Sequence, residues 1–392
     1  MRFVSAVSDR PTAADAVAHV LDQARAGALD RVDLAMLFIT ADHRDEAEWV
    51  LDRINTELSP DALIGCTGEG VIGGDVEIER SPGVSLMIGR FSEGVRASAA
   101  HVGGDEWSNL LDDPLELSEH LGCGEQTRLV VGVGDPWTTP VDGLLRRLDE
   151  LKLPIVGGMA SSGRRAGENR LFIHDRAVDE GFVALTLSGA AAVQTIVSQG
   201  CRPIGGSFVV TRARQNVIEQ LGGKPALEQL RATIDALPEA EKELLRHGLF
   251  IGRAISEYRE RFGRGDFLIR NVMGIFQDQQ SIAAADVVRV GQTVQFHVRD
   301  AATADEDLRM MLAASSGDDL AAPAAALLFT CNGRGTRMFD RPGHDIAAAR
   351  AALGASVPVA GFFAGGEIGP VAGTNFIHGH TASLALIRGQ NS

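Results

Sequence analysis

The sequence has few cysteines and lacks any block of positive charge. Its four cysteines lie far apart without a Cys-x-x-Cys pair, so neither a disulfide framework nor a zinc site made of cysteines is indicated. Acidic residues outnumber basic ones by 52 to 37, which gives a formal net charge of -15. Because the summed field repels polyanions, nucleic acid and anionic membrane surfaces are not expected as partners.

Long apolar runs are missing as well. Glycine or charge interrupts the hydrophobic segments every few residues, so no stretch of the length that crosses a bilayer is expected. The apolar opening at residues 1–6 is followed at once by Asp9 and Arg10, which is too early for a secretory signal. We therefore expect a cytoplasmic protein without membrane insertion.

The motifs of common cofactors are missing or incomplete. There is no Gly-Lys-Ser/Thr phosphate loop and no Gly-x-Ser-x-Gly nucleophile elbow. Gly68, Gly70 and Gly73 have the spacing of a dinucleotide fingerprint, but residues 74–83 continue as a loop where the fingerprint requires a helix. No cofactor is predicted.

One pattern is present three times: strand, helix, strand, glycine-rich segment, closing strand. Its copies have first strands at 34–39, 129–133 and 326–330, helices at 44–58, 142–151 and 344–353, second strands at 62–64, 155–156 and 357–360, glycine-rich segments at 65–74, 157–163 and 361–370, and closing strands at 84–88, 182–187 and 382–387. A strand–helix–strand crossover makes its two strands parallel. The glycine segments, expected as loops, should therefore gather at one sheet edge, where α/β proteins bind ligands.

The region 190–323, between the second and third copies, does not show the repeated pattern. It predicts strands at 194–198, 207–212, 267–276 and 287–299, helices at 225–237, 239–247 and 303–313, and a linker at 315–323. The expected fold is α/β, with mixed sheets built from the repeated units and two domains, 1–190 and 191–392.

Polar residues at the predicted strand ends are candidates for a binding site. Asn332 supplies a donor and an acceptor, and Arg334 offers a forked cation for a carboxylate or phosphate. Glu69 and Glu367 occupy equivalent glycine segments, where they fit a ligand ammonium. The alternatives are that Arg334 pairs with a surface acid, that Cys331 packs as a small hydrophobe, and that both glutamates are solvated loop acids or helix caps.

The segment from Asn375 to Thr381 raises a metal site and a thiol site as further possibilities. In an extended chain His378 and His380 share a face, as in half of a metal site, but Glu367 is the single evident third ligand, so structural or ligand-binding histidines are favoured. Cys66 or Cys331 beside either histidine would form a thiol nucleophile with its base, although buried inert cysteine is commoner.

Several segments together resemble the FIST family, a bacterial sensory module also found in some eukaryotic F-box proteins. Residues 62–74 and 81–86 resemble its amino-terminal domain, and residues 198–205, 268–271, 289–296, 331–335 and 360–370 resemble its carboxyl-terminal domain. The resemblance covers nearly the whole chain. It implies a role in sensing small ligands, with amino acids or related metabolites as the expected class, and FIST modules often lie beside signalling output domains.

No output domain is recognisable in this sequence, so the resemblance implies signalling through a separate protein partner. The family supplies no assigned catalytic residues. We therefore predict a small-ligand-binding sensory protein rather than an enzyme, with a thiol-dependent enzyme or a protein-interaction scaffold as the alternatives. The predicted ligand-binding residues are Cys66, Thr67, Glu69, Ser161, Arg270, Asn271, Cys331, Asn332, Arg334, Glu367, Asn375, His378 and His380.

Overall fold

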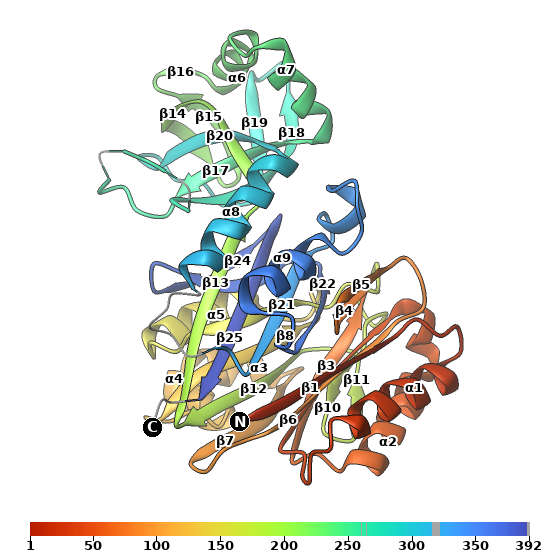
Figure 1. Cartoon of the computed structure of the whole chain (residues 1–392). Coiled ribbons are helices and arrows are strands. Elements are labelled where there is room, and N and C mark those ends of the chain that lie inside the picture. Colours follow the sequence, from red (N-terminus) through yellow and green to blue (C-terminus); the bar gives the residue numbers. More distant parts are fainter. Residues whose placement is uncertain (260, 264, 316–321, 390–392) are drawn as a thin grey trace. The chain divides into compact units, whose positions relative to one another are not determined.

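The contacts of the chain divide it into two units, each described here by itself (Figure 1). The structure, a computed structural model, describes residues 1–259, 261–263, 265–315 and 322–389. Unit 1 comprises Met1–Val197, Leu308–Ile377 and Thr381–Ser392, and unit 2 comprises Ser198–Asp307 and His378–His380. The predicted α/β class with two domains is confirmed. The domain boundary predicted between residues 190 and 191 stays a prediction.

Unit 1 contains three six-stranded sheets with equivalent strand orders. The first is β1 (Arg2–Ser8), β6 (Val84–Arg90), β2 (Leu34–Thr40), β3 (Ala62–Gly68), β10 (Leu171–Ile173) and β11 (Arg176–Val178). The second is β7 (Val95–Val102), β12 (Phe182–Gly189), β8 (Thr127–Gly134), β9 (Ile155–Met159), β23 (Glu367–Val371) and β24 (Thr374–His378). The third is β13 (Ala191–Gln199), β25 (Thr381–Gly389), β21 (Ala325–Cys331), β22 (Val359–Ala364), β4 (Gly70–Gly73) and β5 (Val76–Glu79).

The three repeats exchange hairpins in a cycle. The hairpin β4–β5 follows β3 in the chain but pairs with β22 of the third repeat, and β23–β24 follows β22 but pairs with β9 of the second. The hairpin β10–β11 follows β9 and pairs with β3 of the first. The predicted crossovers are confirmed, because β2–β3, β8–β9 and β21–β22 are all parallel pairs. Each sheet is thus completed by strands from a different repeat.

The glycine segments are mostly strands, so their prediction as loops is wrong. Residues 65–68 belong to β3 and residues 70–73 to β4, with a bend between them at Glu69. At Gly65 a Cβ atom would lie 1.7 Å from the carbonyl oxygen of Leu37 on the neighbouring strand, and at Gly361 it would lie 1.7 Å from that of Leu328. Glycine is therefore needed at both positions for the close approach of neighbouring strands.

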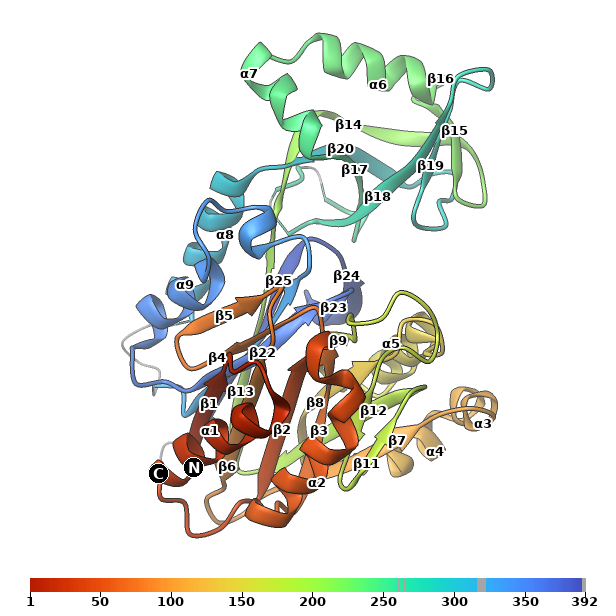
Figure 2. The same ribbon diagram turned by 90° about the vertical axis from the view of Figure 1, so that its right-hand side faces the viewer.

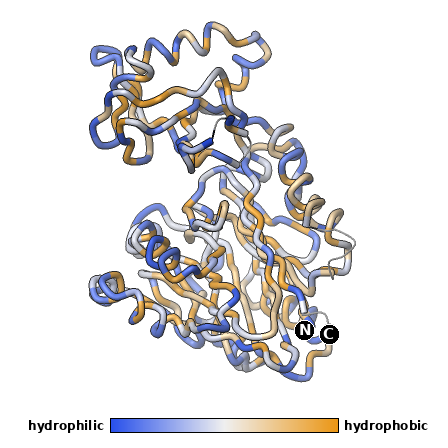
Figure 3. The backbone as a smooth tube through the Cα atoms, turned by 90° about the vertical axis from the view of Figure 1, so that its left-hand side faces the viewer, coloured by the Kyte–Doolittle hydropathy of each residue, from blue (hydrophilic) through white to orange (hydrophobic). Residues whose placement is uncertain are grey.

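Both faces of the three sheets are buried, which explains the continuous apolar runs of their strands. Along β2, alternate side chains such as Phe38 enter a core shared by all three sheets, while the intervening ones such as Leu37 face helices. Phe362 stacks on Phe38 at 5.1 Å and meets Phe329 edge-on at 5.7 Å, which joins the first and third repeats. Figure 3 shows the strands of unit 1 coloured mainly as hydrophobic.

Helices cover the outer faces of the sheets, as Figure 2 shows for α1 and α2. They are α1 (Ala13–Ala26) and α2 (Ala47–Leu58) on the first sheet, α3 (Glu106–Asp112), α4 (Pro114–His120) and α5 (Val141–Glu150) on the second, and α9 (His344–Leu353) with the end of α8 (Ala301–Ala314) on the third. The predicted helices at 142–151, 303–313 and 344–353 are confirmed. The one predicted at 44–58 is α2, preceded by a 3-10 turn at Ala41–Glu46.

Unit 2 is built on one sheet that closes on itself, because its first strand also pairs with its sixth. The order is β14 (Cys201–Arg214), β20 (Thr293–Arg299), β17 (Leu249–Ala254), β18 (Phe267–Phe276), β19 (Ser281–Ala284), β15 (Val217–Leu221) and β16 (Lys224–Pro225). Helices α6 (Ala226–Asp235) and α7 (Glu239–Lys242) and a 3-10 turn at Glu243–His247 accompany it. No helix among the described residues is long and apolar enough to cross a membrane.

The strand and the linker predicted within residues 287–323 differ from the structure or fall largely outside its described residues. The strand predicted at 287–299 begins only at Thr293, because a turn closed by the Gln292 N–H on the Arg289 carbonyl at 3.2 Å precedes it, with Gly291 at φ +92°. Alternation of side chains alone does not distinguish such a turn from a strand. The predicted linker at 315–323 falls mainly on residues 316–321, which lie outside the described residues.

Candidate functional site

The strand ends of the three repeats meet and are hydrogen-bonded to one another, as the crossover argument predicted. Ser161 is the common partner: its N–H donates to the Thr67 carbonyl at 3.2 Å, and its hydroxyl donates to the Phe363 carbonyl. The Gly365 N–H donates to the Met159 carbonyl at 2.9 Å. We call this edge the rim and define it as residues 67–70, 159–162 and 363–367.

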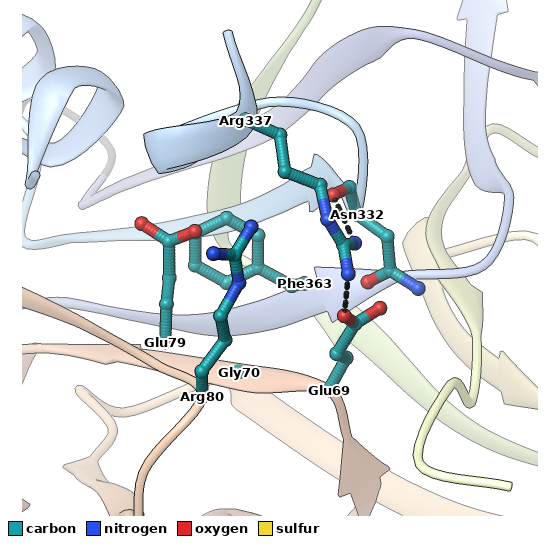
Figure 4. A pocket seen from close by; sticks show the side chains of 7 residues that line it. All are labelled: Glu69, Gly70, Glu79, Arg80, Asn332, Arg337 and Phe363. Carbon is teal, nitrogen blue, oxygen red and sulfur yellow. Dashed lines mark hydrogen bonds and ion pairs between the residues drawn. The ribbon is translucent and has the colours of Figure 1, made fainter. Parts of the chain in front are cut away.

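A small hollow opens at the rim between the first and third repeats (Figure 4). Its volume of about 10 Å³ corresponds to one water molecule. The lining residues are Glu69, Gly70, Glu79, Arg80, Asn332, Arg337 and Phe363. The hollow therefore contains two of the predicted site residues, Glu69 and Asn332, together with two arginines that the sequence argument had not singled out.

Arg337 is the central cation of the hollow. Its guanidinium pairs with the Glu69 carboxylate and donates to the Asn332 carbonyl at 2.8 Å, as the dashed lines of Figure 4 show. The hydrogen bond to Glu69 raises the pKa of Arg337 above its ordinary value. The side chains of Arg337 and Glu69 remain 41% and 34% exposed, so water reaches this ion pair.

A second acid is held rigidly at the edge of the hollow. The Glu79 carboxylate accepts the Thr336 N–H at 3.0 and 3.1 Å and the Thr336 hydroxyl at 3.0 Å. The preceding residue, Gly335, has φ +56°, and a Cβ there would lie 2.5 Å from the Glu79 carboxylate. Glycine is thus required for Thr336 to reach Glu79.

An open groove of about 600 Å³ adjoins the hollow and shares Glu79 with it. Four acidic side chains line it, from Asp9, Asp75, Glu77 and Glu79, of which Glu77 is the one whose pKa burial raises, and no lysine or arginine stands among its described lining residues. A cationic group is therefore favoured in the groove, whereas the hollow beside it also presents arginine.

Arg334 does not line the hollow. It is fully buried, and its guanidinium donates two hydrogen bonds to Asp345, at 2.7 and 2.8 Å. Burial pushes the pKa of Asp345 up, but the Arg334 charge outweighs it and holds that pKa below the usual range. The predicted role of Arg334 as a cation for a ligand is untested, yet in this structure its charge is satisfied inside the protein, and Arg337 takes the place at the surface.

Glu367 is also fully buried, where its carboxyl accepts the N–H of Thr381 at 3.0 Å and its hydroxyl at 2.8 Å. Burial raises the pKa of Glu367 to about 8, and burial followed by the Asp345 charge raises the pKa of Glu77 to about 8. Both glutamates are therefore largely protonated near neutral pH, so the buried Arg334–Asp345 pair lies among uncharged acids.

The predicted thiol chemistry finds no support at Cys66. Its side chain lies in the shared core, and burial raises its pKa well above the ordinary value. Since the thiolate is the nucleophile, this environment disfavours reaction. Thr67 beside it is buried and accepts the Arg170 N–H at 2.8 Å and the Ser162 hydroxyl at 2.7 Å. Cys331 is half-buried, and its sulfur accepts the Gly333 N–H at 3.4 Å.

The remaining predicted residues lie away from the hollow. Asn375 is buried and donates to Asp149 at 2.7 Å and to the Leu153 carbonyl at 2.9 Å, which fixes β24. In unit 2, Arg270 pairs with Asp286 at 3.4 Å. Asn271 lies 3.0 Å from the His380 ring nitrogen.

The two histidines do not share the face of an extended segment, so that prediction is wrong. The strand β24 ends at His378, and His380 lies in a turn with φ +64°. Residues 379 and 380 connect β24 to β25, which belongs to a different sheet. Within the part of the chain that the structure describes, no group of three metal-binding side chains occurs.

Comparison with known proteins places the chain in a family. An uncharacterized protein of Mycobacterium tuberculosis is 40% identical over 398 residues, covering 98% of this chain and 99% of the relative. One of Mycobacterium bovis is 39% identical over 395 residues and 98% of each chain.

Two solved structures share 10% identity with this chain. The match to a chorismatase covers 91% of this chain and 92% of the chorismatase chain, with a TM-score of 0.32. The match to a cyanuric acid hydrolase from A. caulinodans covers 100% of each chain, with a TM-score of 0.35. At these scores the likeness carries no conclusion.

Family models account for most of the sequence. The FIST N domain matches residues 33–224, and the FIST C domain matches residues 226–370. FIST domains are generally described as small-ligand-binding sensory domains. The chain belongs to the FIST family.

Proposed function

We propose that the chain is a cytoplasmic sensory protein whose ligand is a zwitterion, an amino acid or a related metabolite, bound at the hollow and the adjoining groove. The observation that carries the proposal is the meeting of both signs of charge at the rim: Arg337 and Arg80 stand beside Glu69 and Glu79. A zwitterion needs this combination, with a guanidinium for its carboxylate and carboxylates for its ammonium.

The ligand takes its place by exchanging ion pairs. As it stands the hollow admits one water molecule, so Arg337 must release Glu69 before its fork can accept a ligand carboxylate. Exposed pairs of this kind contribute about 0–1 kcal/mol, so the exchange costs little. The ligand ammonium then lies against Glu69 or Glu79, and its side chain extends into the acidic groove.

The residues around the hollow have supporting roles in this proposal. Asn332 orients Arg337 through its carbonyl, and Ser161 fixes Glu69 because the Ser161 hydroxyl accepts the Glu69 N–H at 2.9 Å. Replacing the Arg337–Glu69 pair by a ligand changes the contact between the first and third repeats. A separate signalling protein would read this change.

The test is calorimetry with the common amino acids and their amides on the purified chain, after a thermal-shift screen. A ligand at one hundred times its Kd should add about 2.7 kcal/mol of stability. Arg337→Gln and Glu69→Gln should each weaken binding at least tenfold. Arg341→Gln is the matched control, because Arg341 is exposed in the same segment but does not line the hollow. Unchanged melting and no heat across the panel would overturn the proposal.

A further inference from the structure

Unit 2 contains a cavity of about 330 Å³, a volume within the roughly 300–1,000 Å³ typical of small-molecule sites. It lies among β14, β18, β20 and the first turns of α8. Part of its lining is polar, with Gln199, His297, Asp307 and Arg202, and part is aromatic, with Phe262 and Phe267.

Asp307 is a buried carboxylate without a counter-ion. Its side chain lines the cavity although the residue is only 6% exposed. One oxygen, Oδ2, accepts the Ser198 hydroxyl and the Gln199 N–H, both at 2.8 Å. Across the ranges that the structure describes, no lysine or arginine pairs with Asp307, and its Oδ1 accepts no hydrogen bond. A buried carboxylate is costly unless a cation neutralises it, so the cavity favours a positively charged occupant.

Two further hydrogen-bond acceptors in the lining also favour a ligand with N–H donors. Burial lowers the pKa of His297 to about 4, so its ring is neutral. Its Nδ1 lies 3.0 Å from the Gln295 carbonyl and carries the proton, which leaves Nε2 as an acceptor. The Gln199 amide donates to the Phe267 carbonyl at 2.7 Å, which leaves its oxygen as an acceptor. The polar part of the lining therefore suits a ligand rich in N–H donors.

Arg202, the cation of the lining, is already neutralised. It pairs with Asp300 and with Glu241, each at 3.3 Å, so it offers little net charge to an anion. The rings of Phe262 and Phe267 lie 5.1 Å apart and form an apolar surface, and the Phe267 ring also contacts the His297 ring at 5.4 Å. The cavity thus combines an acid, neutral acceptors and aromatic rings.

We propose that this cavity binds a small organic amine, with the ammonium against Asp307 and an apolar ring on Phe267. The site is independent of the zwitterion site at the rim, because all its lining residues belong to unit 2 and no free cation is available for a ligand carboxylate among those described. Failure of one proposal leaves the other intact.

The test uses 2-phenylethylamine as the probe, with 2-phenylethanol and 3-phenylpropionate as its neutral and anionic counterparts. Calorimetry on the full chain should show binding of the amine, with the alcohol at least tenfold weaker and the acid weaker still. Asp307→Asn keeps the shape and removes the charge, so it should raise the Kd of the amine at least tenfold. Glu306→Gln, the same change at an exposed neighbour, should leave the Kd unchanged.

Several results would overturn the inference: no heat with the amine, stronger binding of the acid, or an Asp307→Asn variant that binds as the wild type does. Should that variant not fold, a crystal structure of the wild-type chain with 4-bromo-2-phenylethylamine decides the matter. A bromine peak in the cavity beside Phe267 supports the proposed amine site. The absence of a bromine peak in the cavity contradicts it.

Discussion

Unit 1 and unit 2 both bury ionisable side chains, but the largest pKa shifts of acids and histidines differ between them. Unit 1 buries two glutamates in their protonated form around the Arg334–Asp345 pair, inside a continuously packed three-sheet body. Unit 2 buries a histidine in its unprotonated form beside a cavity. Burial also lowers the pKa of His43 in unit 1, but that unit holds two carboxyls whose pKa values are raised. Acid should therefore strengthen unit 1 on balance and weaken unit 2.

The largest expected effect comes from Arg334→Met in unit 1. Removing one partner of a buried ion pair typically costs about 3–5 kcal/mol, because the other charge is left uncompensated. Asp345 would be that charge, left with the Thr330 hydroxyl and the His344 ring nitrogen as its partners. All three tryptophans belong to unit 1, so denaturant unfolding followed by tryptophan fluorescence measures the loss there.

The matched control is the double variant Arg334→Met with Asp345→Leu, which leaves no unpaired charge and should recover at least half of the lost free energy of unfolding. An equal loss in the single and double variants would show that shape, rather than charge, governs this part of unit 1.

The second prediction is an opposed pH dependence of the two units. The folded pKa values of Glu77 and Glu367, about 8, exceed the ordinary 4.5, so unit 1 should lose stability as the pH rises from 4.5 to 8. The folded pKa of His297, about 4, lies below the ordinary 6.5, so the free energy of unfolding of unit 2 should fall by on the order of 3 kcal/mol as the pH falls from 6.5 to 4. Pulse proteolysis with detection of the fragments by mass spectrometry measures the stability of each unit separately.

Two variants sharpen this comparison. Glu367→Gln should reduce the pH slope of unit 1 by about one proton, or about 1.4 kcal/mol per pH unit. His297→Gln should flatten the slope of unit 2 and leave unit 1 unchanged. If the stability of both units changes with pH in the same direction in the wild type, the proposed contrast between raised carboxyl pKa values in unit 1 and a lowered histidine pKa in unit 2 is wrong.

The smallest expected effect is that of Glu69→Gln at the rim. Its pair with Arg337 is exposed to water, and such pairs contribute about 0–1 kcal/mol, so unfolding free energy should change by less than 1 kcal/mol. This pair and the buried Arg334–Asp345 pair use arginines three residues apart. A loss above about 2 kcal/mol would mean that the rim pair is structural and too costly for a ligand to open.

The repeated part of the fold was predictable because its signals are local. Apolar periodicity located α5 (Val141–Glu150) and α9 (His344–Leu353), and the crossover rule gave the parallel pairs. The exchange of hairpins was not predictable, since a short apolar strand such as β4 (Gly70–Gly73) can pair with any open sheet edge. Its partner β22 lies almost at the other end of the chain.

The candidate site was predictable only in part. Glu69 and Asn332 were identified because they follow strands, but the choice between Arg334 and Arg337 depends on Asp345, which belongs to a helix beyond the segment. The cavity of unit 2 was missed because its polar residues come from separate elements. One signal was present: Asp307 falls on the same helix face as the buried Ala304 and Leu308.

The cyclic exchange of hairpins constrains how the chain can be made. The edge of β4 cannot pair until β22 has emerged from the ribosome, since Ile72 faces Gly361 in the finished sheet. At translation rates of about 5–20 residues per second, that strand waits on the order of 15–60 s with open backbone groups. Premature association with another nascent copy is the hazard during this interval, and co-translational chaperone capture of the first repeat is its natural remedy.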